Sequence, residues 1–316
     1  MILIAGEALV DMVAKSGNKQ EYAAIPGGSA FNVACALGLL GATTTFACPI
    51  SKDTSGDVLM NTMQRCGVSP YLSQRTAAHT PLALVNVNEL GQPSYAFYRE
   101  GTADRMLEPL NLQKSLDGIH IMHITGFCLN ESTDYRQWLK LVKQAKAEGA
   151  IISVDPNVRE SLISDPDDYR ERIKALLAIA DVVKVSDEDL HYLYPDITLA
   201  AAVEKLKQLV TLAIITYGAK GAEAYCAGKK SFEAAQKVEQ LVDTVGAGDC
   251  FSAAYIYQLY RLEIFKPEQL AQLTKEQLSK VLIFASTAAA INCGRKGCQP
   301  PTVDEVNRKI ELASSN

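Results

Sequence analysis

The chain has 316 residues, with 31 lysines and arginines against 36 aspartates and glutamates, so its formal net charge is −5. Hydrophobic residues make up 48% and charged residues 21%, which fits a globular protein and excludes a disordered, collagen-like or coiled-coil chain. The acidic balance argues against nonspecific nucleic-acid binding, because that needs a basic surface. The longest strongly apolar stretch, residues 281–291, is too short to span a bilayer, and the N-terminus lacks the basic region of a signal peptide. We therefore expect a cytoplasmic protein without membrane contact.

Short apolar segments rich in β-branched residues alternate with helical patterns along most of the chain. We expect strands at residues 2–5, 44–47, 118–124, 151–155, 182–185 and 212–216. Residues 29–40 predict a helix with a cap at Ser29, and residues 135–147 predict one that ends before Gly149. Continuous apolar strands alternating with helices predict an α/β fold, in which helices cover both faces of a mainly parallel sheet.

One region interrupts this alternation. Residues 82–88 and 94–99 predict the two strands of a β-hairpin around the turn-rich residues 89–93. Residues 12–25 are polar and punctuated by glycine and asparagine, and predict a further strand. We therefore expect one domain over residues 1–316, with a small β-rich lid formed by about residues 12–25 and 82–103.

The eight cysteines include no CxxC pair and lie in apolar segments of a long chain, so we expect reduced thiols. His120 and His123 lie three apart on a predicted strand, where an odd spacing places side chains on opposite faces. A metal site shared by this pair is therefore not expected.

The strongest local signal is DTVGAGDCFSAA at residues 243–254. Small residues at 246–248 let the backbone approach a ligand, and the helical pattern that follows directs N–H groups and the helix dipole at one spot. That spot suits a phosphate or a phosphoryl group in transfer. Asp249 would repel a phosphate there, but it could accept a proton from an attacking hydroxyl. An ordinary helix N-cap is the alternative role for this residue.

A second glycine cluster, Gly27 and Gly28, also leads into a helix that carries Asn32. Close backbone approach combined with an amide suits the hydroxyls of a sugar, although a tightly packed strand-to-helix loop explains the glycines equally simply. The usual nucleotide motifs are missing, since the first strand is followed by GEAL rather than GxGxxG and no GxxxxGK[ST] occurs. This argues against a dinucleotide-dependent dehydrogenase.

GGSAFNVACALGLLG near the N-terminus and DTVGAGDCFSAA near the C-terminus resemble the two motifs of the PfkB (ribokinase-like) family of carbohydrate kinases. Their order and spacing match over essentially the whole chain. Within the family, the segments GEALVDM, SYAFYREGTADRM, DPNVR with VKVSDEDL, and CGRKGCQPPT look most like bacterial fructokinases. The resemblance implies a ribokinase-like fold and ATP-dependent phosphorylation of a sugar primary hydroxyl, with Mg²⁺, from fructose to fructose 6-phosphate.

The resemblance also implies roles for individual residues. Asp249 matches the catalytic base, and the anion hole matches Gly246, Ala247 and Gly248. The sugar would contact Asp11, Gly27, Gly28, Asn32 and, from the lid, Arg99. Asn157 and Arg159 match positions between the sugar and the phosphates, where a guanidinium neutralises developing charge well.

The nucleotide and the metals would lie on the other side of the base. Positions that match the ATP site are Lys184, Ser186, Thr216, Gly218, Gly221, Ala285, Ala289 and Asn292. A family motif that organises Mg²⁺ through water reads Ser186-Asp187-Glu188-Asp189 here, so either Asp189 or Glu188 could serve, and a solvated acidic helix start is the alternative. Asp243 and Val245 match positions that hold K⁺ in some members.

Two alternatives remain from the sequence. The acceptor could instead be 2-keto-3-deoxygluconate, ribose, a nucleoside or another ketose; for the keto acid, Arg99, Arg105 and Arg159 are candidate cations. A noncatalytic sugar or nucleotide sensor is the remote alternative. A homodimer through the lid is also expected, if its outer face carries Leu84, Val85, Tyr95 and Phe97.

Overall fold

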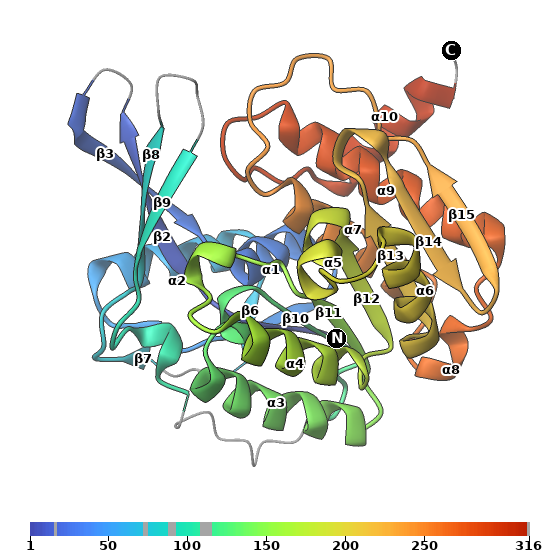
Figure 1. Ribbon diagram of the computed structural model, residues 1–316. Coiled ribbons are helices and arrows are strands. Elements are labelled where there is room, and N and C mark those ends of the chain that lie inside the picture. The colour runs from blue at the N-terminus through green and yellow to red at the C-terminus, as the bar shows by residue number, and fades with distance from the viewer. Residues whose placement is uncertain (16–17, 72–74, 88–92, 108–115, 315–316) are drawn as a thin grey trace.

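The centre of the molecule is a nine-stranded sheet with the order β15-β14-β13-β12-β11-β10-β1-β4-β6 (Figure 1). The computed structural model describes residues 1–15, 18–71, 75–87, 93–107 and 116–314. Neighbours from β6 to β13 run parallel, and β14 and β15 are antiparallel at one edge. The bounds are β1 (Ile2–Ala5), β4 (Thr44–Ala47), β6 (Ser69–Pro70), β10 (Ile121–Thr125), β11 (Ile151–Asp155), β12 (Val182–Ser186), β13 (Leu212–Thr216), β14 (Ala222–Cys226) and β15 (Lys229–Glu233).

Helices cover both faces of this sheet, which confirms the predicted α/β fold (Figure 1). One apolar layer includes residues of α1 (Ser29–Leu39), α2 (Thr54–Arg65), α7 (Ala247–Arg261), α9 (Lys275–Cys293) and α10 (Val303–Ser314). The other includes residues of α3 (Ser132–Ala147), α4 (Pro166–Leu177), α5 (Asp187–Leu193) and α6 (Leu199–Leu209). Ile2 and Ile4 of β1 enter the first layer and Leu3 and Ala5 the second, because successive strand residues face opposite sides.

Most predicted elements have bounds close to those observed. The strands at residues 2–5, 44–47, 151–155 and 212–216 match, and β12 runs one residue further. β10 begins at Ile121 rather than residue 118, because Gly118 has a φ of 79° and lies in a turn. No helix of the described residues is long and apolar enough to cross a membrane.

A second, four-stranded sheet with the order β3-β2-β8-β9 projects beside the main body (Figure 1). It contains β2 (Leu9–Lys15), β3 (Asn18–Gly27), β8 (Leu82–Val87) and β9 (Pro93–Tyr98). The predicted hairpin is confirmed, and most of its connecting loop lies outside the described residues. The further strand predicted within residues 12–25 is present as β3, and residues 12–15 are the end of β2, which runs antiparallel to it.

The predicted apolar outer face of this sheet is wrong. Leu84 and Val85 are adjacent in β8 and therefore lie on opposite faces. Phe97 packs edge-to-face on Phe127, with ring centroids 4.8 Å apart, so it faces the main body. The side chain of Tyr95 lies outside the described part of the structure.

Candidate active site

The carboxyl ends of the parallel strands bring polar side chains to one edge of the sheet. Asp155 ends β11, Ser186 ends β12, and Glu7 follows β1 by two residues. α1 and α7 pack against each other and begin at this same edge. Ligands of open α/β sheets bind at the carboxyl ends of strands, so this edge is the candidate site.

Asp249 is the third residue of α7 and is bound from α1. Ser29 Oγ donates to its Oδ1 at 2.7 Å, and Asn32 Nδ2 donates to its Oδ2 at 2.8 Å. The N-cap of α7 is Gly246, so the alternative of Asp249 as a helix cap does not apply. Burial raises the pKa of Asp249, although the Ser29 and Asn32 donors oppose this shift. The carboxylate is thus held in a fixed orientation and is a stronger base than an exposed aspartate.

Ser29 has a different role from the one predicted. The N-cap of α1 is Gly28, and the Ser29 hydroxyl makes no capping bond. It accepts from Asn157 Nδ2 at 2.6 Å and donates to Asp249. Sequence reasoning missed this contact because serine at a helix start is the usual cap residue, and nothing in the sequence pairs it with a residue 220 positions away.

The glycine turn before Asp249 is shaped by its neighbours. Gly246 has a φ of 74°, and a Cβ there would lie 2.4 Å from Cys298 Sγ. A Cβ on Gly248 would lie 3.5 Å from Lys184 Nζ, which places this ammonium group beside the turn. The first N–H groups of a helix have no partner within it. Helix N–H groups and a buried ammonium therefore converge where an anion would be bound.

Lys184 is fixed by Asp155, which the sequence analysis did not single out. Lys184 Nζ donates to Asp155 Oδ2 at 2.9 Å, and both side chains are buried. Burial opposes the charged form of Lys184, but the charge of Asp155 raises its pKa above the ordinary value. The signal available in the sequence was a carboxylate directly ending an apolar strand.

The predicted sugar side gathers around Asp11 of β2. A Cβ on Gly27 would lie 2.3 Å from Asp11 Oδ2, so glycine is needed for the carboxylate to lie there. Burial and the charge of Asp249 raise the pKa of Asp11 to about 6. Gly28 has a φ of 103°, and a Cβ there would lie 2.9 Å from the Glu7 carbonyl oxygen. The structure thus brings Asp11, Asn32 and both glycines to Asp249.

The two candidates for a metal-linked carboxylate differ in burial. Glu188 is exposed, whereas Asp189 is partly buried, and burial and the charge of Asp155 raise its pKa to about 6. The Arg159 charge lowers the pKa of both Asp189 and Asp249, so it acts on both carboxylates, while its Nη1 donates to the Val158 carbonyl at 3.0 Å. Ser186, predicted near ATP, accepts the Asp189 N–H at 3.0 Å as the N-cap of α5.

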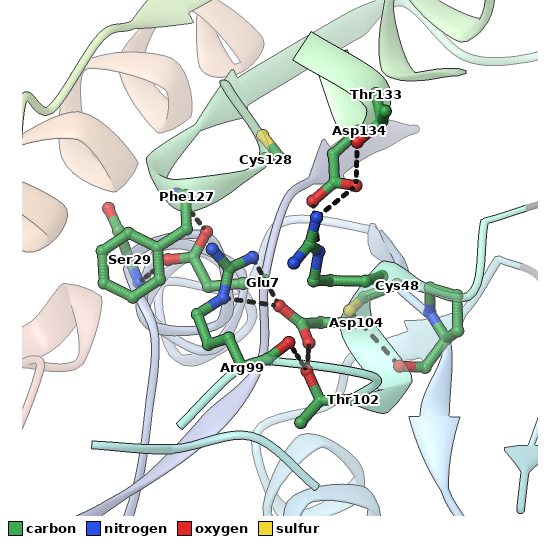
Figure 2. Close-up of polar contacts among 12 residues, drawn as sticks. Glu7, Ser29, Cys48, Arg99, Thr102, Asp104, Phe127, Cys128, Thr133 and Asp134 are labelled. Atoms are coloured by element: carbon green, nitrogen blue, oxygen red, sulfur yellow. Dashed lines mark hydrogen bonds and ion pairs between the residues drawn. The ribbon is translucent and has the colours of Figure 1, made fainter. Parts of the chain in front are cut away.

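Arg99, which the sequence analysis expected to reach the sugar from the lid, is paired within the protein in this structure. Its Nε and Nη2 donate to Asp104 Oδ2 at 3.0 and 2.7 Å, and its guanidinium lies 5.0 Å from the Phe127 ring centroid (Figure 2). Only 11% of its side chain is exposed. In this structure Arg99 joins the lid to the main body instead of standing free for a substrate.

The positions predicted to contact the nucleotide differ in their exposure. Ala289 is partly exposed, but Ala285 is fully buried between helices and offers no surface to a base. Gly218 and Gly221, with φ of 55° and 115°, flank a short turn after Thr216. Asn292 is buried, and its Nδ2 donates to the Val245 carbonyl at 2.8 Å.

The predicted K⁺ positions, Asp243 and Val245, lie in the loop before α7, which is joined to the loop after α9. Asp243 accepts the Val245 N–H at 3.0 Å through Oδ1 and the Gly297 N–H at 2.9 Å through Oδ2. Across the described ranges, no group of three or more histidine, cysteine, aspartate or glutamate side chains could hold a metal ion. All eight cysteines are free, as expected.

Comparison with known proteins gives consistent results over nearly the whole chain. The family described as pfkB family carbohydrate kinase matches residues 1–305. The chain is 36% identical to a fructokinase of Rhizobium leguminosarum bv. trifolii, over 88% of this chain and 85% of that protein. It is 30% identical to probable fructokinase-2 of Arabidopsis thaliana, over 95% and 92%. The solved structure of a fructokinase with bound ATP from Xylella fastidiosa has a TM-score of 0.90 and 28% identity, over 99% of this chain and 98% of that one.

Proposed function

Because the chain belongs to the pfkB family of carbohydrate kinases, we propose that it transfers the γ-phosphoryl group of ATP to the primary hydroxyl of fructose. The observation that carries the proposal is Asp249, held by Ser29 and Asn32 at the start of α7, beside the glycine turn. The names of the relatives support fructose as the acceptor, and the ATP bound in the Xylella fastidiosa structure supports ATP as the donor.

In the proposed reaction, Asp249 takes the proton of the sugar 6-hydroxyl as its oxygen attacks the γ-phosphoryl group. Burial makes the carboxylate a better proton acceptor by raising its pKa. The turn at Gly246, Ala247 and Gly248 directs N–H groups at the phosphoryl group, where fixed donors stabilise the charge of the transition state. Lys184 and Arg159 add positive charge beside this position.

The remaining proposed contacts follow from their placement. Asp11, Gly27, Gly28 and Asn32 would hold the sugar, and Asn157 orients the Ser29 hydroxyl. Thr216, Gly218, Gly221 and Ala289 would border ATP. Asn292 would act through the Val245 loop that it holds, rather than on the base itself.

The residues present fit Mg²⁺, which prefers oxygen ligands and keeps several waters. Asp189 is the carboxylate that would hold it through water, since it lies beside Lys184 and Arg159 whereas Glu188 is exposed. When bound, Mg²⁺ would neutralise phosphate charge. For K⁺ we propose the oxygens of Asp243 and Val245, because each keeps a lone pair beyond its observed hydrogen bond.

We also propose that the chain is a single domain in which the β3-β2-β8-β9 sheet is a lid that closes over the sugar and excludes water. The eight free cysteines fit a reducing compartment, so we propose the cytoplasm as its location.

The proposed function is tested by measuring ADP release from Mg-ATP with fructose, ribose, 2-keto-3-deoxygluconate, adenosine and tagatose, each with K⁺ and with Na⁺. We expect a kcat/KM for fructose at least tenfold above the others, and faster turnover in K⁺. A tenfold preference for 2-keto-3-deoxygluconate would contradict fructose as the acceptor. Sugar and nucleotide binding without ADP release would instead favour a noncatalytic sensor.

A homodimer through the lid is a further proposal. Tyr98 at the end of β9 keeps 60% of its surface exposed and is the lid residue that a second chain would cover. Sedimentation at micromolar concentration is expected to give twice the 34.2 kDa mass of one chain. Sedimentation as a single chain would remove this proposal, and Tyr98→Lys is expected to convert the dimer to single chains.

A further inference from the structure

Glu7 is a buried carboxylate that the proposed reaction does not use directly. It is 2% exposed and follows β1 at the edge of the sheet where the site lies. Its Oε1 accepts the Ser29 N–H at 2.7 Å, and its Oε2 accepts the Phe127 N–H at 2.8 Å. Hydrogen bonds to a charged acceptor are stronger than neutral ones, so Glu7 joins the start of α1 firmly to the segment after β10.

The surrounding backbone is shaped to admit this carboxylate. A Cβ on Gly126 would lie 2.3 and 2.5 Å from the two Glu7 oxygens, and Gly126 has a φ of 85°. A Cβ on Gly28 would meet the Glu7 carbonyl oxygen at 2.9 Å. A larger residue at Gly126 would displace the Glu7 carboxylate and one at Gly28 would displace the backbone at Glu7, which indicates a specific site for the Glu7 side chain.

On one side, Glu7 contacts the residue on which the lid rests. Phe127, whose N–H it holds, packs its ring against Phe97 of β9 and lies under the Arg99 guanidinium. Asp104 fixes Arg99, and Thr102 Oγ1 donates to Asp104 Oδ1 at 2.6 Å (Figure 2). The lid base and the Glu7 carboxylate therefore belong to one buried cluster.

On the other side, Glu7 contacts the residue that holds the base. Ser29 gives its N–H to Glu7 and its hydroxyl hydrogen to Asp249. We propose that Glu7 is a positioning residue for phosphoryl transfer, which holds Ser29 on Asp249 and couples this contact to the lid through Phe127 and Arg99. This inference rests on the proposed function, and it adds a residue and a coupling to it.

The charge state of Glu7 gives the proposal a distinctive readout. Burial raises the pKa of Glu7 to about 7, although the Arg99 charge and the Ser29 and Phe127 N–H groups lower it. The other ionisable groups of the cluster are Asp104, Asp134 and the thiols of Cys48 and Cys128. The carboxylate is charged above about pH 7 and accepts both N–H groups, whereas below it the proton removes one acceptor. We therefore expect kcat/KM for the sugar to fall as the pH drops through about 7.

The experiment compares the wild type with Glu7→Gln, Ser29→Ala and the double variant. Glu204→Gln, at an exposed glutamate of α6, is the matched control. Glutamine cannot accept both N–H groups, so we expect kcat to fall about 10–100-fold, as for loss of a charged hydrogen bond. We expect KM for ATP to change less than twofold. We also expect the fall of kcat/KM for the sugar below about pH 7 to disappear.

Ser29→Ala keeps the backbone N–H and removes only the hydroxyl, so it tests the coupling even if Glu7→Gln does not fold. Ser29→Ala is also expected to lose the fall of kcat/KM near pH 7. The kcat of the double variant is expected to be no lower than that of the less active single variant. A fall of kcat/KM near pH 7 that persists in Ser29→Ala, additive losses in kcat, or a Glu7→Gln enzyme with more than half of the wild-type kcat would overturn the proposal.

A separate readout does not depend on turnover. The protection factors of the Ser29 and Phe127 amides, which correct for the pH dependence of intrinsic exchange, are expected to fall at least tenfold in folded Glu7→Gln, and in the wild type below pH 6. Unchanged exchange would overturn the positioning role whatever the enzyme phosphorylates. An inactive wild type with the expected exchange would contradict the proposed function alone.

Discussion

Replacing Asp249 with asparagine is expected to lower kcat by about 10²–10⁴-fold, the usual contribution of a general base. The amide has the same shape as the carboxylate but cannot accept a proton from the sugar. One of its two atoms can still accept from Ser29 or Asn32, so the local structure should persist. The measurement is steady-state turnover of purified Asp249→Asn with ATP and fructose.

The control is Asp304→Asn, an exposed carboxylate at the start of α10. It is expected to keep wild-type turnover, and both variants should match the wild type in far-ultraviolet circular dichroism. A folded Asp249→Asn enzyme with more than a tenth of the wild-type activity would show that another group takes the proton.

Gly246→Ala is expected to lower kcat by about 10²–10³-fold, as when a donor to the developing anion is lost. Alanine is disfavoured at a φ of 74° by about 1–2 kcal/mol. Its Cβ would also overlap Cys298, at 2.4 Å from Sγ and 2.6 Å from Cβ, so the turn must move. We expect KM for fructose to change much less than kcat, because the proposed sugar contacts lie on β2, at the end of β3 and at the start of α1.

Gly149→Ala separates backbone strain from displacement of the turn. Gly149 follows α3 with a φ of 90°, and a Cβ there would meet no atom within 4 Å. Urea unfolding should show a similar loss of stability from the backbone in both variants, whereas only Gly246→Ala should lose turnover. Equal kcat in the two variants would mean that the turn does not stabilise the transferring group.

The main sheet could be predicted because its strands are apolar on both faces. Residues 151–155 and 212–215, for example, are buried throughout, and such segments stand out from the surrounding polar sequence. The strands of the lid, β2 and β3, are partly exposed and lack a continuous apolar run, so their number could not be inferred from composition. Their pairing depends on contacts between strands, which a local pattern does not contain.

The candidate site also has features that the sequence indicated and features that it did not. The positive φ values at Gly246 and Gly28 are a property of the local chain, and the sequence indicated both glycines. Ser29 binds Asp249, 220 positions away, which no local pattern indicates. Arg99 pairs with Asp104, five positions further on, and the sequence analysis gave both Ser29 and Arg99 other roles. Glu7 was missed because a carboxylate after a strand is unremarkable until Gly126 and Ser29 are known to lie against it.

Phosphorus NMR of the product formed from ATP and fructose tests the central claim most directly. The account predicts one fructose phosphate for each ADP released, with the phosphate on the primary C6 oxygen, and almost none from Asp249→Asn. ADP release that is independent of the sugar, or a phosphate on a different oxygen, would contradict the roles assigned to Asp249 and the turn before it.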